Sequence, residues 1–338
     1  MSAMYRKPSA LFLLISLCLL ASHPVHGREK KVVSLTPRTL VVRAPRPPVD
    51  SDLALLAPAG SQLAIWLDVR RIHDSPVNAM ATSVINLNLP AGLPEKPLRR
   101  LLREAHELLV LSGCTPDGAP TSLTIIRGAF DGAQVLADFR PAGPENDTVV
   151  GTLTGIRLRE FVAISPTPQT VAIGTPALVE QIPGLLESGA TSLRRDPSFE
   201  DFSMKGAAGV LRLRTSDVPM DACIARTPFL KQWTWVHGVR SADAILHLAD
   251  GALLESGFTL NNDNDASTGR NVLTKELRAI LSNPLLRMFN IGWVGKRIRF
   301  AADGPQLTIR AEFRNKDITI LSNLIEPLLE IQRIIASQ

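Results

Sequence analysis

Hydrophobic residues along the chain recur at two spacings, one typical of strands and one typical of helices. Leu63 to Val69 is a compact apolar run with β-branched residues, which predicts a buried strand. Residues 70–84 carry apolar positions at helical spacing, with Pro76 near the first turn. Further strands are predicted at 108–111, 122–126, 148–153, 161–164 and 170–173, and helices at 132–139 and from Thr175 to Leu186.

The chain from residue 209 onward repeats this order in outline. Strands are predicted at 209–213, 234–239, 244–248, 253–260, 297–301 and 307–313, and helices at 219–230, 272–281 and 317–335. Both parts contain a strand, a helix, paired strands, a helix, paired strands and a helix, which indicates an internal duplication. We therefore predict an α+β fold of two related halves, 58–190 and 191–338. Each half is predicted as a mostly antiparallel sheet with helices packed on one face.

The predicted C-terminal helix is amphipathic. Its apolar seam consists of Leu321, Leu324, Leu328, Ile331 and Ile335. We expect this seam to dock on the protein's own sheet, and contact with a partner protein is the second interpretation. The charges of Glu326, Glu330 and Arg333 argue against burial in lipid.

The N-terminal 57 residues have a composition of their own. Residues 1–27 combine basic Arg6 and Lys7, an apolar run over 10–21 and small Gly27, the order of a cleavable signal peptide. The alternatives are an uncleaved anchor, for which the apolar run is short, and a lipoprotein modified at Cys18. Residues 28–57 are rich in proline and arginine and predict an extended tether. We expect a periplasmic or secreted protein without a transmembrane segment in the mature chain.

The positive net charge of the chain is confined to its N-terminal residues. The net charge is +5, but the predicted leader and tether carry all of the excess. Residues from 53 onward hold equal numbers of basic and acidic side chains. Because phosphate binding needs concentrated cationic surface, nucleic acid is excluded as the main partner.

The chemistry-bearing residues form no metal or cofactor motif. Cys114 and Cys223 are the only cysteines after the predicted leader, and they either form a disulfide or lie apart as buried thiols. Residues 261–265 (Asn-Asn-Asp-Asn-Asp) cluster oxygen ligands of the kind calcium prefers, but their spacing does not match an EF-hand. A turn leading into a helix explains them better. No metal and no cofactor is predicted.

Aromatic residues give one candidate ligand site. Trp233, Trp235 and His237 alternate on a predicted strand and would share one face. Such a face could stack on a sugar or contact an apolar ligand. Packing in the core is the competing and preferred interpretation, because a chain with only 5% aromatic residues should bury most of them.

Several turns and caps resemble those of a known group of proteins. The strand Val171–Gly174 leads into a Thr175–Pro176 helix cap, and Ser192–Phe199 (SLRRDPSF) forms a turn before the next strand. This order resembles exported bacterial proteins of a myxobacterial-type domain-of-unknown-function group, built from repeated α+β units. The resemblance covers about half of the chain and implies export and fold, but no active site.

No catalytic signature is present in the sequence. There is no Gly-x-Ser-x-Gly elbow, no Ser-x-x-Lys motif and no phosphate loop. The leading hypothesis is an exported periplasmic or cell-envelope protein, non-enzymatic, that binds or scaffolds an envelope protein or cell-wall partner. The alternatives are a carrier of an apolar or carbohydrate ligand and a hydrolase of unrecognised type.

Overall fold

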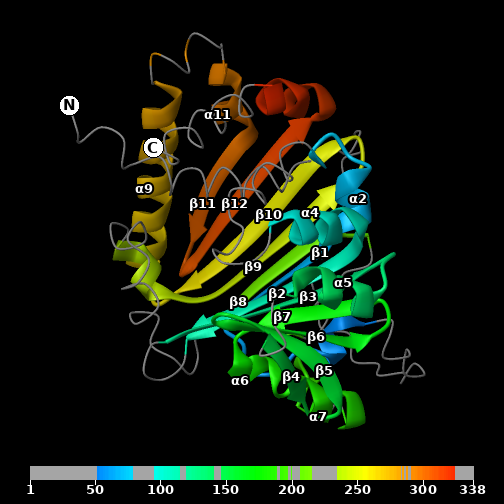
Figure 1. Ribbon diagram of the computed structural model, residues 1–338. Coiled ribbons are helices and arrows are strands. Elements are labelled where there is room, and N and C mark those ends of the chain that lie inside the picture. The colour runs from blue at the N-terminus through cyan, green and yellow to red at the C-terminus, as the bar shows by residue number, and fades with distance from the viewer. Residues whose placement is uncertain are drawn as a thin grey trace, which may run out of the picture.

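The chain folds around one twisted antiparallel sheet of twelve strands, seen in a computed structural model (Figure 1). The structure describes residues 52–78, 95–114, 119–140, 146–188, 191–196, 199, 206–214, 234–282, 284, 287 and 291–323. The strand order is β11-β12-β10-β9-β8-β1-β2-β3-β7-β6-β5-β4, and every neighbouring pair is antiparallel. The α+β class predicted from the hydrophobic pattern is confirmed.

The elements have the following bounds. The strands are β1 Leu63–Asp68, β2 Ala105–Cys114, β3 Pro120–Gly128, β4 Asp147–Val150, β5 Leu153–Leu158, β6 Phe161–Thr167, β7 Thr170–Gly174, β8 Gly209–Arg214, β9 Val239–Leu248, β10 Gly251–Leu260, β11 Ile298–Asp303 and β12 Gln306–Arg314. The α-helices are α2 Val69–His73, α4 Glu95–Glu104, α5 Gly132–Phe139, α6 Pro176–Val179, α7 Ile182–Ser188, α9 Asp263–Leu281 and α11 Val294–Arg297. The 3₁₀ helices are η2 Leu53–Leu55, η4 Leu193–Arg195, η7 Thr234–Gly238 and η8 Ile291–Trp293. Residues 315–323 are also helical.

The two predicted halves share this one sheet instead of forming a sheet each. They join where β1 pairs with β8, with Leu63 opposite Leu213 and Leu67 opposite Gly209. The core near the join also mixes the two parts, because Ala64 and Leu109 belong to the same buried cluster as Val210. The prediction of two separate sheets is therefore wrong. Local patterns mark strands but do not say which strands pair across long sequence distances.

Helices cover both faces of the sheet over strands β1 to β7. On one face Leu109 and Ile125 pack with Val179 of α6 and Ile182 of α7. On the opposite face Leu108, with other alternate strand residues, packs under α4 and α5, whose buried contacts are Leu98, Leu101, Val135, Leu136 and Phe139. The expectation of helices on one face only is wrong for this part, where strands are apolar on both sides.

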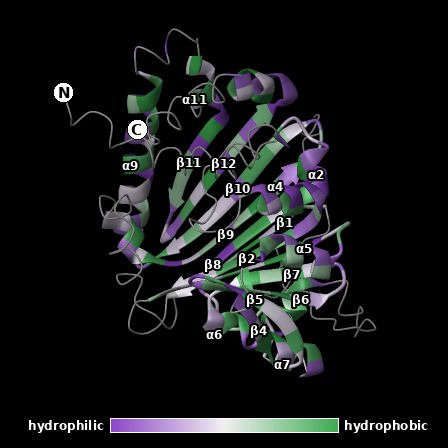
Figure 2. Ribbon diagram, viewed as in Figure 1, coloured by the Kyte–Doolittle hydropathy of each residue, from purple (hydrophilic) through white to green (hydrophobic). Residues whose placement is uncertain are grey.

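Over strands β9 to β12 the helices of the described residues lie on one face. Ala266 and Leu273 of α9 pack with Leu260 and Ile309. Ile318 and Leu321, from the helix over residues 315–323, belong to a cluster with Leu254 of β10 and Phe313 of β12. The prediction that the C-terminal helix docks on the protein's own sheet is confirmed for these residues, and Leu324 onward lies outside the described part. Figure 2 shows hydrophobic and hydrophilic residues alternating along β11 and β12.

Some predicted elements have different bounds. The helix expected over 70–84 ends at His73, and the strand expected over 148–153 is the β4–β5 hairpin. The strand expected over 234–239 is the 3₁₀ helix η7 followed by β9. The helix predicted at 219–230 and the segments 1–51, which include the predicted signal peptide, lie outside the described residues. Among the helices that are described, none is both long and apolar enough to cross a membrane.

Candidate functional site

The face of β12 turned away from α9 is polar along its whole length. Leu307, Ile309, Ala311 and Phe313 are buried toward the helices. The alternate residues, Gln306, Thr308, Arg310, Glu312 and Arg314, lie on the other side and are exposed except Glu312, which is intermediate. Because successive side chains of a strand point to opposite faces, this alternation defines an open surface. We call this side of strands β8 to β12 the polar face.

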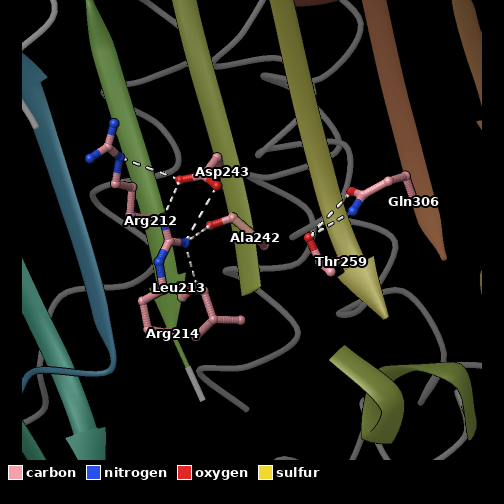
Figure 3. A network of polar contacts seen from close by, with 7 residues as sticks. All are labelled: Arg212, Leu213, Arg214, Ala242, Asp243, Thr259 and Gln306. Carbon is pink, nitrogen blue, oxygen red and sulfur yellow. Dashed lines mark hydrogen bonds and ion pairs between the residues drawn. The ribbon is translucent and has the colours of Figure 1, made fainter. Parts of the chain in front are cut away.

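Two arginines on the polar face share one carboxylate (Figure 3). Arg212 Nε lies 3.3 Å and Arg214 Nη2 lies 3.0 Å from Asp243 Oδ1, across the pairing of β8 with β9. Arg214 Nη1 also donates to the backbone oxygen of Leu213 at 2.8 Å. The arginine side chains are 17% and 24% exposed, whereas that of Asp243 is 47% exposed. The group carries two positive charges against one negative charge, with the carboxylate toward solvent.

Cross-strand polar pairs continue over β10 and β12. Arg310 Nη1 donates to Glu255 Oε1 at 2.6 Å, and these residues are directly opposite in the sheet. Thr259 and Gln306 are also opposite and hydrogen-bond to each other at 3.2 and 3.3 Å (Figure 3). Arg310 is 52% and Glu255 is 46% exposed. Because an exposed ion pair stabilises a fold by only about 0 to 1 kcal/mol, stability does not explain this concentration of charge.

Among the described residues, none covers the middle of the polar face at Gly257. Gly257 lies opposite Thr308 in the sheet, and a side chain added at Gly257 would have no heavy atom within 4 Å of its Cβ. The corresponding side of β2 and β3 carries buried leucine and isoleucine under helices. The difference between the two parts of the sheet follows from the sequence, since β12 has a polar residue at every second position. That nine-residue alternation was a readable signal, and the prediction of site residues missed it.

The structure does not place the described residues of the predicted aromatic site on one face. Trp235 is 4% exposed and packs edge-on against Phe258, with ring centroids 5.9 Å apart. His237 is exposed. These two residues do not share a face, because η7 is a 3₁₀ helix and not the expected strand. Trp233 lies outside the described residues. The core interpretation of Trp235 is confirmed, and ligand binding by Trp233, Trp235 and His237 stays an untested prediction.

The remaining predicted chemistry is partly located. Cys114 is the last residue of β2, and Cys223 lies outside the described residues, so their disulfide stays a prediction. Within residues 261–265, the possible calcium ligands, Asn262 is the N-cap of α9 and its Oδ1 accepts from the Asp265 amide at 2.9 Å. The turn-and-helix interpretation is confirmed. Within the described ranges no three His, Cys, Asp or Glu side chains cluster as a metal site requires.

One polar contact was not predicted at all. Arg70 of α2 and His106 of β2 lie side by side, with Arg70 Nη2 2.7 Å from Nδ1 and 2.8 Å from Nε2 of the imidazole. Partial burial, together with the positive charges of Arg70 and Arg127, lowers the pKa of His106. The sequence offered no signal for this contact, because the predicted strand began only at residue 108, whereas His106 lies at a register shift between β2 and β3.

Together the fold and the polar face define a class: an antiparallel α+β protein whose sheet is covered by helices on both faces over β1 to β7 and, among the described residues, on one face over β9 to β12. No family model matches the chain, and no curated protein matches it in sequence. Among solved structures it is similar to three crystal forms of TP0453, each with a TM-score of 0.44. Form I is 12% identical and covers 82% of this chain and 97% of that one. Form III is 10% identical and covers 80% of this chain and 97% of that one. Form IV is 9% identical and covers 81% of this chain and 95% of that one. Neither site residues nor a function are carried over at this level of similarity.

Proposed function

We propose that this chain is an exported cell-envelope protein that acts by binding another protein through its polar face. The observation that carries the proposal is the set of in-register polar pairs across β8 to β12, with the half-exposed pair of Arg310 and Glu255 at its centre. Charges of both signs occur there on neighbouring strands, and this pattern fits the mixed polar surface of a folded protein better than a small ligand. Export is supported by the leader-like residues 1–27.

Site-specific photo-crosslinking tests this function. A photoreactive residue in place of Thr308, on the polar face, should capture a defined envelope protein in living cells. The matched control is the exposed Thr154 of β5, at the far end of the same sheet. Capture at both positions to the same extent, or at neither, would contradict the proposal.

A charge exchange tests the chemistry of the same face. Glu255→Arg combined with Arg310→Glu keeps an opposite pair in the same register, so the sheet should be as stable as before. Partner recognition should fall at least tenfold, because like charges then meet across the interface. If the captured protein binds the exchanged variant with unchanged affinity, the polar face is not the contact surface.

We also propose that the two parts arose by duplication. The order β1-β2-β3-β7-β6 reads outward from the join in the same way as β8-β9-β10-β12-β11. Around the join, Leu193 N–H donates to Ala57 O and Ala59 N–H donates to Thr191 O, both at 2.7 Å, so segments before β1 and β8 also pair. The proposal predicts that a two-fold rotation about the β1–β8 pair places β1, β2, β3, β7 and β6 on β8, β9, β10, β12 and β11. The residue pairing between neighbouring strands should be the same in both sets. A different rotation or an odd register offset would contradict it.

A further inference from the structure

The contact between Arg70 and His106 brings together two side chains of the same charge type. A guanidinium group donates hydrogen bonds and stays protonated, so the imidazole must be neutral to accept from it. The two distances, 2.7 and 2.8 Å, place Arg70 Nη2 equally close to both ring nitrogens. Among the described residues, no carboxylate forms an ion pair with either side chain.

The carboxylates of the neighbourhood are engaged elsewhere. Glu107, on the same strand as His106, is paired with Arg127 of β3. Asp68 accepts from the Arg71 amide at 3.0 Å and thereby caps α2. Glu104, at the end of α4, pairs with Arg100. Arg103, one position earlier, adds an exposed cation. Within the described part of the chain, Arg70 and His106 therefore have no carboxylate paired with them.

We propose that Arg70 and His106 together bind a tetrahedral oxyanion of the sulfate or phosphate type at the junction of α2 with β2. The guanidinium supplies a charge-assisted hydrogen bond through Nη1 or Nη2, and the imidazolium supplies a second through a ring N–H. The oxyanion replaces the direct contact between the two side chains, because both then donate to it. Binding takes up one proton on His106.

The sign of the pH dependence follows from this proton. Without the anion the pKa of His106 is held below its ordinary value by partial burial, Arg70 and Arg127. A bound anion stabilises the imidazolium and must raise that pKa, and by linkage the anion binds more tightly at low pH. Glu107 does not reverse the sign, because it is paired with Arg127.

The test follows the imidazole resonances of His106 by NMR in the full chain, titrated from pH 8 to pH 4.5. Sulfate is the probe, because it does not itself titrate in this range. We expect saturating sulfate to raise the pKa of His106 by about one, equivalent to about tenfold tighter binding to the protonated form. The exposed His237 serves as the internal reference and should not move.

Variants separate a binding role from a structural one. Arg70→Gln should weaken sulfate binding about tenfold and abolish the shift at His106, since a charge-assisted hydrogen bond is lost. Arg70→Lys should restore part of the shift, and Arg103→Gln, the neighbouring cation, should retain it. An Arg70→Gln variant that is folded and still shows the full shift would overturn the proposal.

A second arm identifies the source of the oxyanion. Vesicles of phosphatidylglycerol in phosphatidylcholine present the same phosphate chemistry as a lipid headgroup, and they are compared with free sulfate. A rise in the His106 pKa with sulfate alone indicates a free oxyanion, and a rise with vesicles indicates a headgroup. If neither raises it, the site does not exist.

Discussion

Charged side chains in this protein contribute differently according to their depth. Asp317 is 5% exposed, accepts from the Arg314 amide at 3.0 Å and lies 3.2 Å from Arg297 Nη2. A buried carboxylate that loses its partners is costly, so these contacts are needed for the helix over 315–323 to dock. The pair Glu255 and Arg310 is half exposed and contributes little to stability. Burial therefore distinguishes charged residues that stabilise the fold from charged residues that are available for binding.

Replacing Asp317 tests the first class. Asp317→Ala removes the acceptor for the Arg314 amide and leaves Arg297 without its carboxylate, so the free energy of unfolding should fall by about 2 to 4 kcal/mol. Urea denaturation measures the change. Glu276→Ala on the exposed side of α9 is the control and should change stability by less than about 0.5 kcal/mol. Equal effects of the two substitutions would show that the buried contacts do not matter.

Replacing His106 tests the effect of its lowered pKa on stability. The unfolded chain binds a proton at His106 at a higher pH than the folded chain does, so folding becomes less stable as the pH falls below the ordinary histidine value of about 6.5. His106→Asn should therefore show a shallower loss of stability between pH 7 and pH 5 in sulfate-free buffer. A profile as steep as that of the parent protein would refute this assignment.

At the scale of elements, α9 shows what a local pattern can and cannot predict. Asparagine and aspartate at 261–265 indicated a turn leading into a helix, but the helix was predicted from residue 272, whereas α9 begins at Asp263. The strand predicted at 234–239 was wrong, because Trp-x-Trp-x-His alternation fits a strand while the chain forms η7 there. The conformation of this segment is set by a tertiary contact. A Cβ on Gly269 of α9 would lie 3.1 Å from Trp235 Cδ2, so the helix packs directly on the indole. The polar face was missed for a different reason: the alternation of polar and apolar residues was visible in the sequence, but alternation does not say where on the exposed side a binding site lies.

The N-cap of α9 can be tested by one substitution. Asn262→Ala removes the 2.9 Å hydrogen bond to the Asp265 amide and should lower the free energy of unfolding by about 1 kcal/mol. Asn271→Ala, within the same helix and exposed, should be neutral or slightly stabilising because alanine has the higher helix propensity. Thermal melts compare the two variants, and a larger loss from Asn271→Ala would contradict the capping role.

At the scale of the whole molecule, the join between β1 and β8 makes the described strands one sheet. The buried cluster around Leu109 includes Phe199 and Val210 from beyond the join, so neither part completes its core alone. The sequence predicted most strands of both parts and their order along the chain, but not the 3₁₀ helix η7 or the β4–β5 hairpin. The pairing of β1 with β8 into one sheet could not be predicted, because the paired residues are separated by about 145 positions and no local periodicity encodes such a contact.

Shared packing predicts cooperative unfolding. Trp66 in β1 and Trp293 in η8 report on opposite sides of the join. Variants that keep only one of these tryptophans should give coincident urea transitions by fluorescence, because loss of either part exposes the common cluster. Two transitions separated in denaturant would show instead that the parts unfold independently.

The central place of β1 in the sheet has a consequence for the timing of folding. As the chain leaves the ribosome, β2 can pair with one side of β1 early, but the other side stays open until residue 214 has emerged. For that interval β1 is a transient edge strand that presents unpaired amide and carbonyl groups to other chains. The loop closed by the β1–β8 pairing is long, so this step should be slow and set the overall rate. A chaperone that covers β1 before β8 arrives would therefore increase the yield of folded protein more than one that acts later.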